Sequence, residues 1–168
     1  MKLLVAIFAG LVATSAVAAP ASPQAPTPGW QFVRWGMTPA ELRAASNGAV
    51  PANTDPGYDR MKGEYAMGKF KFDVVFDYHP PANDPGNTDP STLGLDAVML
   101  DLNLKSGSCA KLEAYLKTLY GPPDRTADKG PAGDTWSRKD IGDDVSYSTF
   151  DPKKACSVMY MALGASSQ

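Results

Sequence analysis

Residues 69–79 read KFKFDVVFDYH, and this stretch decides the fold class of the chain. Its apolar side chains recur at every second position, which is typical of a β-strand with one face on a core and the other toward water. Pro80-Pro81 ends the strand, because proline has no backbone N–H to donate to a sheet. The apolar face consists of Phe70, Phe72, Val74, Phe76 and Tyr78.

A short helix is predicted before this strand. Thr38 and Glu41 have the spacing of a capping box, and Pro39 suits the first helical turn, where its missing N–H costs nothing. The helix is expected to end near Asn47-Gly48. Two more strands of this half are expected at about residues 59–67 and 95–104.

The second half of the chain repeats this order. A helix is predicted to begin at a cap formed by Ser106 or Ser108 and to end at Gly121. Apolar residues recur along it at helical spacing, so one stripe is expected to face the core. The stripe consists of Cys109, Leu112, Tyr115, Leu116 and Leu119.

The two halves together predict one α+β domain over residues 30–164, with residues 165–168 as a tail. Each half supplies a helix and three strands. Antiparallel hairpins with one apolar face need a cover, and the two helices are the only candidates. We therefore expect a single antiparallel sheet with both helices packed on one face. The strands of the second half are expected at about residues 134–139, 144–150 and 154–163.

The first residues have the pattern of a secretory signal peptide. Lys2 is followed by an apolar run over residues 3–12, and Ala16-Val17-Ala18 has the form that signal peptidase accepts. Because the apolar run is shorter than the about 20 residues of a membrane-spanning helix, cleavage is favoured over a retained anchor. We expect residues 1–18 to be removed and residues 19–29, rich in Pro and Ala, to form a flexible segment.

The chain contains two cysteines, Cys109 and Cys156. An even count in an exported chain favours a disulfide. Two cysteines and one histidine do not make a tetrahedral metal site, and without a C-x-x-C motif a reactive thiol pair is unsupported. The sequence therefore predicts a Cys109–Cys156 disulfide in a periplasmic or secreted protein that has no integral membrane segment after cleavage.

Charge and motif content narrow the function classes. The formal net charge is −2 at pH 7, so no basic surface for nucleic acid is expected. No serine lies in a G-x-S-x-G setting, and the chain has no glycine-rich phosphate loop. We therefore expect no catalytic, cofactor-binding or metal-binding residues and no cofactor.

His79 is the only histidine and the main alternative to that expectation. A general base needs a partner, and Asp77 is close to it in sequence. A solvated residue at a strand end is the competing interpretation. Other Asn and Asp residues offer calcium ligands or acid–base pairs, but the loops lack calcium-loop spacing and suit ordinary turns. They are Asn53, Asp55, Asn83, Asp84, Asn87, Asp89, Asp128, Asp134, Asp140, Asp143 and Asp144.

The second face of the predicted sheet is the candidate contact surface. Methionine side chains adapt to partners of different shape, and on this face they alternate with polar residues such as Asp73 and Asp101. A solvated face with a few scattered apolar side chains is the alternative. The candidate contact residues are Val75, Met99, Met159 and Met161.

Residues 35–42, WGMTPAEL, resemble a WGM-S/T-P-x-E segment near the start of many uncharacterised, exported bacterial proteins. Leu119-Tyr120-Gly121-Pro122-Pro123, followed by Trp136, resembles the helix exit of the same group. The helix-then-hairpin order is also similar to the BamE (SmpA/OmlA) domain and to the modules of the β-lactamase inhibitor protein. At the level of the fold, these resemblances imply a protein-binding rather than a catalytic role.

The function expected from the sequence is therefore that of an exported, non-enzymatic module that binds a protein or envelope partner. Two alternatives stay open. One is a small hydrolase that uses His79 with a nearby Asp, and the other is a purely structural envelope protein.

Overall fold

The computed structural model describes residues 30–52, 58–127 and 131–163. The predicted signal peptide, the segment of residues 19–29 and the tail of residues 165–168 lie outside these ranges. The helices are α1 (Pro39–Ala45) and α2 (Cys109–Tyr120). The strands are β1 (Tyr58–Arg60), β2 (Tyr65–Met67), β3 (Phe70–His79), β4 (Gly94–Leu102), β5 (Arg125–Ala127), β6 (Ala132–Arg138), β7 (Asp143–Asp151) and β8 (Ala155–Ala162).

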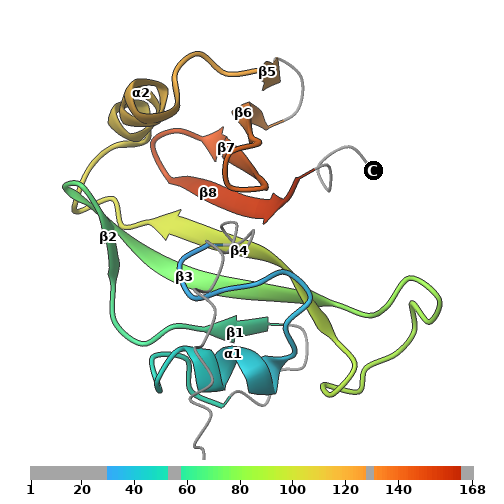
Figure 1. The fold of residues 1–168 in the computed structure, drawn as a ribbon. Coiled ribbons are helices and arrows are strands. Elements are labelled where there is room, and N and C mark those ends of the chain that lie inside the picture. The colour runs from blue at the N-terminus through green and yellow to red at the C-terminus, as the bar shows by residue number, and fades with distance from the viewer. Residues whose placement is uncertain (1–29, 53–57, 128–130, 164–168) are drawn as a thin grey trace, which may run out of the picture.

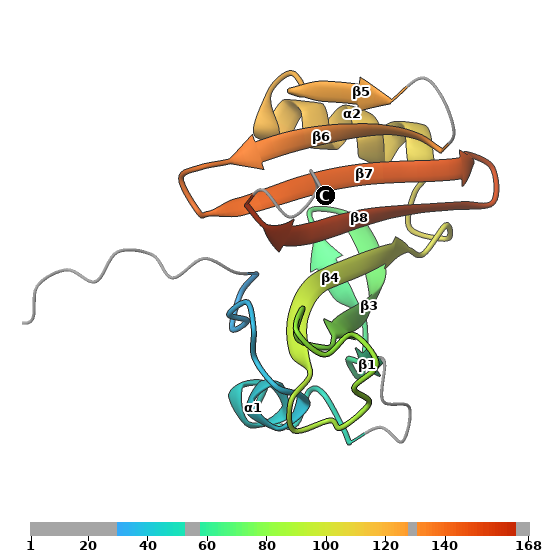
Figure 2. The ribbon, with the colours of Figure 1, turned by 90° about the vertical axis from the view of Figure 1, so that its right-hand side faces the viewer.

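The strands form one eight-stranded sheet in the order β1-β3-β4-β8-β7-β6-β5, with β2 also paired to β3. Every pairing is antiparallel, which confirms the predicted α+β class and sheet type. The first half of the chain forms the end of the sheet beside α1, and the second half forms the end beside α2 (Figure 1). The sheet is strongly twisted, so that β7 and β8 run across Figure 2 while β3 and β4 run steeply.

Each helix precedes four strands, so the prediction of three strands per half was wrong. The strand expected over residues 59–67 is divided at a bend, where Gly63 has a positive φ of 77°. Its two parts, β1 and β2, pair with opposite ends of β3. The additional strand of the second half, β5, lies in a segment predicted as a loop, because its three residues are all exposed and show no alternation.

The core lies on the face of the sheet that carries the predicted apolar residues of β3. Across the central strands, Val74 lies opposite Leu100, Leu100 opposite Val158, and Val158 opposite Tyr147. All four side chains are buried. The alternation that predicted β3 thus continues as a cross-strand row through β4, β8 and β7.

Helix α1 begins at the predicted capping box. The Thr38 hydroxyl accepts a hydrogen bond from the Glu41 N–H at 3.3 Å, and the Glu41 carboxylate accepts one from the Thr38 N–H at 2.8 Å. Arg43 Nη1 lies 3.1 Å from Asp59 Oδ2 of β1, and the Tyr78 hydroxyl donates to the same oxygen at 3.0 Å. Because Asp59 is buried, this pairing holds α1 at the β1 end of the sheet.

Helix α2 buries Cys109, Leu112 and Leu116 completely. Leu119, predicted for the same stripe, is 49% exposed, so its placement there was wrong. In the last turn Tyr120 takes the core-facing position instead. Its ring lies 5.8 Å from that of Trp136, and its hydroxyl lies 2.8 Å from the Tyr160 hydroxyl. Tyr120 is therefore the last core-facing residue of α2. Its ring packs against the core, and its hydroxyl group finds a hydrogen-bond partner there.

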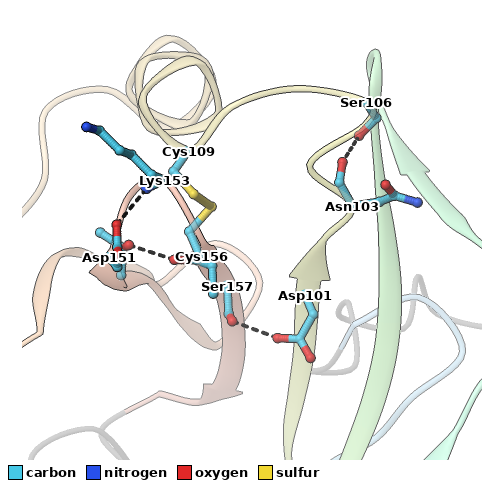
Figure 3. The surroundings of a disulfide bond; sticks show 10 residues. Asp101, Asn103, Ser106, Cys109, Asp151, Lys153, Cys156 and Ser157 are labelled. Atoms are coloured by element: carbon cyan, nitrogen blue, oxygen red, sulfur yellow. Dashed lines mark hydrogen bonds between the residues drawn. A yellow bond between two sulfur atoms is a disulfide. The ribbon is translucent and has the colours of Figure 1, made fainter.

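The N-cap position of α2 is Ser108, but its side chain makes no capping hydrogen bond. The other predicted cap, Ser106, instead links β3 to the turn that follows β4. Its hydroxyl donates to the Asn103 carbonyl at 2.7 Å (Figure 3) and accepts from the Lys71 N–H at 2.9 Å.

The predicted disulfide between Cys109 and Cys156 is confirmed, with a Cα–Cα distance of 5.8 Å. It joins the first residue of α2 to β8 beneath it (Figure 3). Its two cysteines are 47 residues apart, and the chain-entropy model gives roughly 4 kcal/mol for closing a loop of that length. The bond therefore ties α2 to the sheet and restricts the unfolded chain.

Neither helix in the described ranges combines the length and the apolar character that crossing a bilayer requires.

Replacing both cysteines by serine should lower the free energy of unfolding by roughly 2–4 kcal/mol, because the unfolded chain regains its loop entropy. Urea unfolding of the oxidised wild type and of the Cys109→Ser/Cys156→Ser variant measures the difference. The reduced wild type is the control and should unfold like the variant. Equal midpoints for the oxidised and reduced wild type would contradict the stabilising role of the bond.

Candidate functional site

Five apolar side chains lie together on the sheet face opposite the core, which we call the methionine face. Val75 lies opposite Met99, and Met99 lies opposite Met159 on β8. Met161 lies opposite Ala97 in the next row. The register thus brings all four predicted contact residues into one patch. The residues of the methionine face are Val75, Ala97, Met99, Met159 and Met161.

The exposure of these side chains is uneven. Val75 and Ala97 are 5% and 6% exposed, whereas the three methionines are half-buried. None of the five belongs to the core cluster of the described residues, which gathers on the other face. The methionines therefore form the accessible part of the patch, and Val75 lies between them and the β1 edge.

Carboxylates border the methionine face. Asp73 of β3 lies directly opposite Asp101 of β4. The Ser157 hydroxyl donates to Asp101 Oδ1 at 2.7 Å (Figure 3). Among the described residues, no salt bridge reaches Asp73 or Asp101. Like charges directly opposite each other in an antiparallel pair are destabilising, so this arrangement costs the free protein stability.

A β-bulge at the other end of the β3–β4 pair builds a second candidate site. Asp77 pairs with Ala97 and Tyr78 pairs with Leu95, so Asp96 is an extra residue on β4. Such a bulge redirects the side chains beside it. His79 Nδ1 lies 2.6 Å from Asp96 Oδ2, and the side chains are 60% and 48% exposed.

Asp77 completes this cluster. One ligand atom from each of Asp77, His79 and Asp96 lies within 4.8 Å of the other two. The hydrogen bond that the His79 ring donates to the Asp96 carboxylate raises the pKa of His79. Partial burial raises the pKa of Asp77, with Asp96 adding to the effect and His79 opposing it. The cluster is thus a set of one nitrogen and two carboxylate donors, of the kind that holds a divalent cation.

A surface hollow of about 380 Å³ adjoins the cluster. Trp35 and the two prolines that end β3 form part of its wall, together with His79 and Asp96. Thr92 is the only hydroxyl in the described lining, and no thiol lies there. The hollow can therefore admit a small ligand beside the cluster, but it offers no serine or cysteine nucleophile.

Three of the later aspartates, Asp134, Asp140 and Asp143, pair with other side chains of the fold. Lys117 Nζ lies 2.9 Å from Asp134 Oδ2, and the Trp35 ring donates to Asp143 Oδ1 at 2.9 Å. Asp140 pairs with Arg138. Positions in or beside turns had been expected for Asp134, Asp143 and Asp144. All three are buried within strands, and Asp143 is the first residue of β7 after a turn. Asn53, Asp55 and Asp128 lie outside the described ranges.

The loop before β4 forms ordinary turns. Asn87 accepts from the Asp89 N–H, and Asp89 accepts from the Ser91 N–H, at 2.8 and 2.9 Å. The hydrogen bonds from the backbone and side chain of Ser91 lower the pKa of Asp89. Asn83 and Asp84 lie exposed in the same loop. The Asn and Asp content of this loop is therefore explained by turn formation.

Two residues that matter for these sites were missed from the sequence. Asp96 interrupts the apolar alternation of β4, since the spacing from Leu95 to Val98 is three residues and then returns to two. That irregularity is the signal of a bulge. Phe150 is 87% exposed near the end of β7, where the pairing with β8 shifts register between Ser148 and Asp151.

Comparison of this chain with protein-family models, with curated proteins and with solved structures finds no match. The resemblances inferred from the sequence therefore stay predictions.

Since His79 is the only histidine, its imidazole signals in an NMR pH titration are unambiguous. In tag-free protein kept in a chelator, the pKa of His79 should lie above its ordinary value of about 6.5, because the Asp96 carboxylate stabilises the charged ring. The Asp96→Asn variant should return the pKa toward the ordinary value, and Asp84→Asn should leave it unchanged. A wild-type pKa at or below the ordinary value would disprove the pairing.

The raised pKa of His79 determines how the free energy of unfolding depends on pH. Because the folded pKa of His79 is raised, the His79–Asp96 pairing contributes its stability below the pKa of the unfolded chain. That contribution is lost as the pH rises through the folded pKa.

Proposed function

We propose that this protein is an exported, non-enzymatic module that binds a partner protein through the methionine face. The partner segment carries apolar side chains flanked by Lys or Arg. The observation behind the proposal is the unneutralised Asp73–Asp101 pair beside three accessible methionines. A local arrangement that costs stability is commonly kept for function, and a basic partner would remove the cost.

The proposal also assigns a separate role to each face of the sheet. Both helices cover the core face, and the opposite face binds the partner. Two contacts support this. Cys109 of α2 is bonded to Cys156, which alternates with core residue Val158 along β8. Arg43 of α1 reaches Asp59, which lies opposite core residue Phe76. With the helices there, the methionine face is left for a partner.

An extracytoplasmic location, in the periplasm or the medium, belongs to the same proposal. Disulfides persist in oxidising compartments and are rare in the cytosol, and the Cys109–Cys156 bond fits that distribution. The pattern of residues 1–18 fits export as well. In that location, the partner would be another envelope or secreted protein, which would contact the methionine face through aliphatic and basic side chains.

A small hydrolase that uses His79 is the second candidate. It is favoured by the 2.6 Å contact between His79 and Asp96 at the edge of a hollow, because a carboxylate that orients an imidazole is part of many hydrolytic sites. The described lining holds no serine or cysteine, so an activated water is the nucleophile that this candidate assumes. Equal hydrolysis of nitrophenyl esters by wild type and His79→Gln would exclude this candidate.

The Asp73→Asn substitution should raise the free energy of unfolding by about 0.2–1 kcal/mol, because it removes one of two opposed carboxylates. Chemical unfolding at low ionic strength measures the change. The matched control is Asp84→Asn in the exposed loop, which should leave stability unchanged. If Asp73→Asn destabilised the protein, the two carboxylates would not repel each other as described.

Photo-crosslinking in the producing cells should locate the partner contact. A photoreactive residue in place of Ser146, which lies opposite Met159, should label one protein. The same residue in place of Thr118, exposed on α2, should not label it. Labelling should weaken as salt is added, because the contact pairs carboxylates with basic side chains.

The control variants for this experiment change the methionines. Met159→Asp/Met161→Asp should abolish labelling from position 146, and Met159→Gln/Met161→Gln, which keeps the side-chain volume, should weaken it. Leu119→Asp, at an exposed apolar residue of α2, should leave it intact. Thermal unfolding verifies that each variant is folded. Undiminished labelling in both methionine variants would refute the proposed contact.

A further inference from the structure

The cluster of Asp77, His79 and Asp96 has no part in the proposed partner contact, and its geometry suits a different ligand. The three donor atoms come from two adjacent strands and lie within 4.8 Å of one another. The bulge on β4 supplies Asp96, and the alternation of β3 brings Asp77 and His79 to the same side.

The spacing of the donors is close to that of a metal site. A tetrahedral zinc ion with bonds of 2.0–2.2 Å separates neighbouring ligand atoms by roughly 3.4 Å. His79 Nδ1 and Asp96 Oδ2 lie 2.6 Å apart, so a cation would replace the proton between them. The three donor atoms lie within 4.8 Å of one another, which is of the order of this separation.

A second observation concerns the other oxygen of Asp96. Asp96 Oδ1 is buried and accepts no hydrogen bond within the described part of the chain. Buried polar atoms in folded proteins nearly always have a partner, and a bound ion is one of the explanations for an exception. Asp96, whose side chain is 48% exposed as a whole, thus has one oxygen whose acceptor capacity no group in the described part of the chain uses.

We propose that Asp77, His79 and Asp96 bind a divalent transition-metal cation, with Zn²⁺ as the ion that fits best. Imidazole nitrogen together with carboxylate oxygen suits Zn²⁺, whereas Ca²⁺ takes six to eight oxygen ligands. Both cysteines are held in the disulfide, so no thiolate competes for the ion.

The inferred site is open. Three protein ligands leave a coordination position for water or for an anionic group. The adjoining hollow, walled in part by Trp35 and Thr92, has room for such a group. A metal ion bound here could therefore exchange the water in its open coordination position for an anionic group.

Isothermal titration calorimetry with ZnCl₂ tests the inference. The protein is oxidised, free of any histidine tag and stripped with a chelator beforehand, so that His79 is its only imidazole. Wild type should bind one Zn²⁺ per chain. His79→Gln and Asp96→Asn should each weaken binding by about tenfold or more, and Asp84→Asn should leave it unchanged.

The imidazole resonances of His79 give an independent readout. One equivalent of Zn²⁺ should shift them, and the same concentration of Mg²⁺ should not. The stability that the His79–Asp96 pair contributes is lost above the folded pKa of His79, and the His79 side chain is 60% exposed. In the chelator, at a pH above that pKa, His79→Gln should therefore keep the wild-type unfolding transition, which separates loss of binding from loss of fold.

Binding of equal strength in wild type, His79→Gln and Asp96→Asn would mean an adventitious surface ion only, and it would overturn the inference. Absence of any Zn²⁺-dependent shift of the His79 ring would do the same. Neither result bears on the methionine face, since the two proposals rest on different residues.

Discussion

The burial of a single apolar face is the constraint on which the rest of this sheet depends. Val74, Leu100 and Val158 lie in one row across β3, β4 and β8, and each is at most 1% exposed. A slip of one residue in the pairing would turn this row to water and the methionines inward. The register that creates the core therefore also creates the methionine face, and the two cannot be changed independently.

Two anchors complement that burial. Helix α1 has seven residues, and α2 has twelve, so neither is stable as an isolated helix in water. The Arg43–Asp59 pair holds α1 to β1, and the Cys109–Cys156 bond holds α2 to β8. Each helix is thus fixed to the sheet by a specific contact, an ion pair for α1 and a disulfide for α2.

The sequence was sufficient to predict those features for which a local pattern agrees with the packing in the folded protein. The period-two pattern of β3, the capping box at Thr38 and the even cysteine count each predicted a feature that the structure contains. The methionine residues could be assigned to one face for the same reason, because alternation fixes the face once the strand is known.

The remaining features depend on pairing between distant segments. The bulge that brings Asp96 to His79 is a register shift between β3 and β4, and only the interrupted spacing after Leu95 hints at it. The exposed strand β5 has no apolar face to reveal it. The bend at Gly63 divides residues 59–67, for which strand propensity alone predicts one continuous strand. The candidate cation site was missed because its residues meet only through this register.

Solvent accessibility of the methionine methyl groups tests the central claim that one face is buried and the other open. Methyl-labelled protein is titrated with a soluble paramagnetic agent, and the broadening of each methionine signal is recorded by NMR. The signals of Met99, Met159 and Met161, which are half-buried on the open face, should broaden more than those of the buried Met37 and Met67. Equal protection of all five methyl groups would contradict the account.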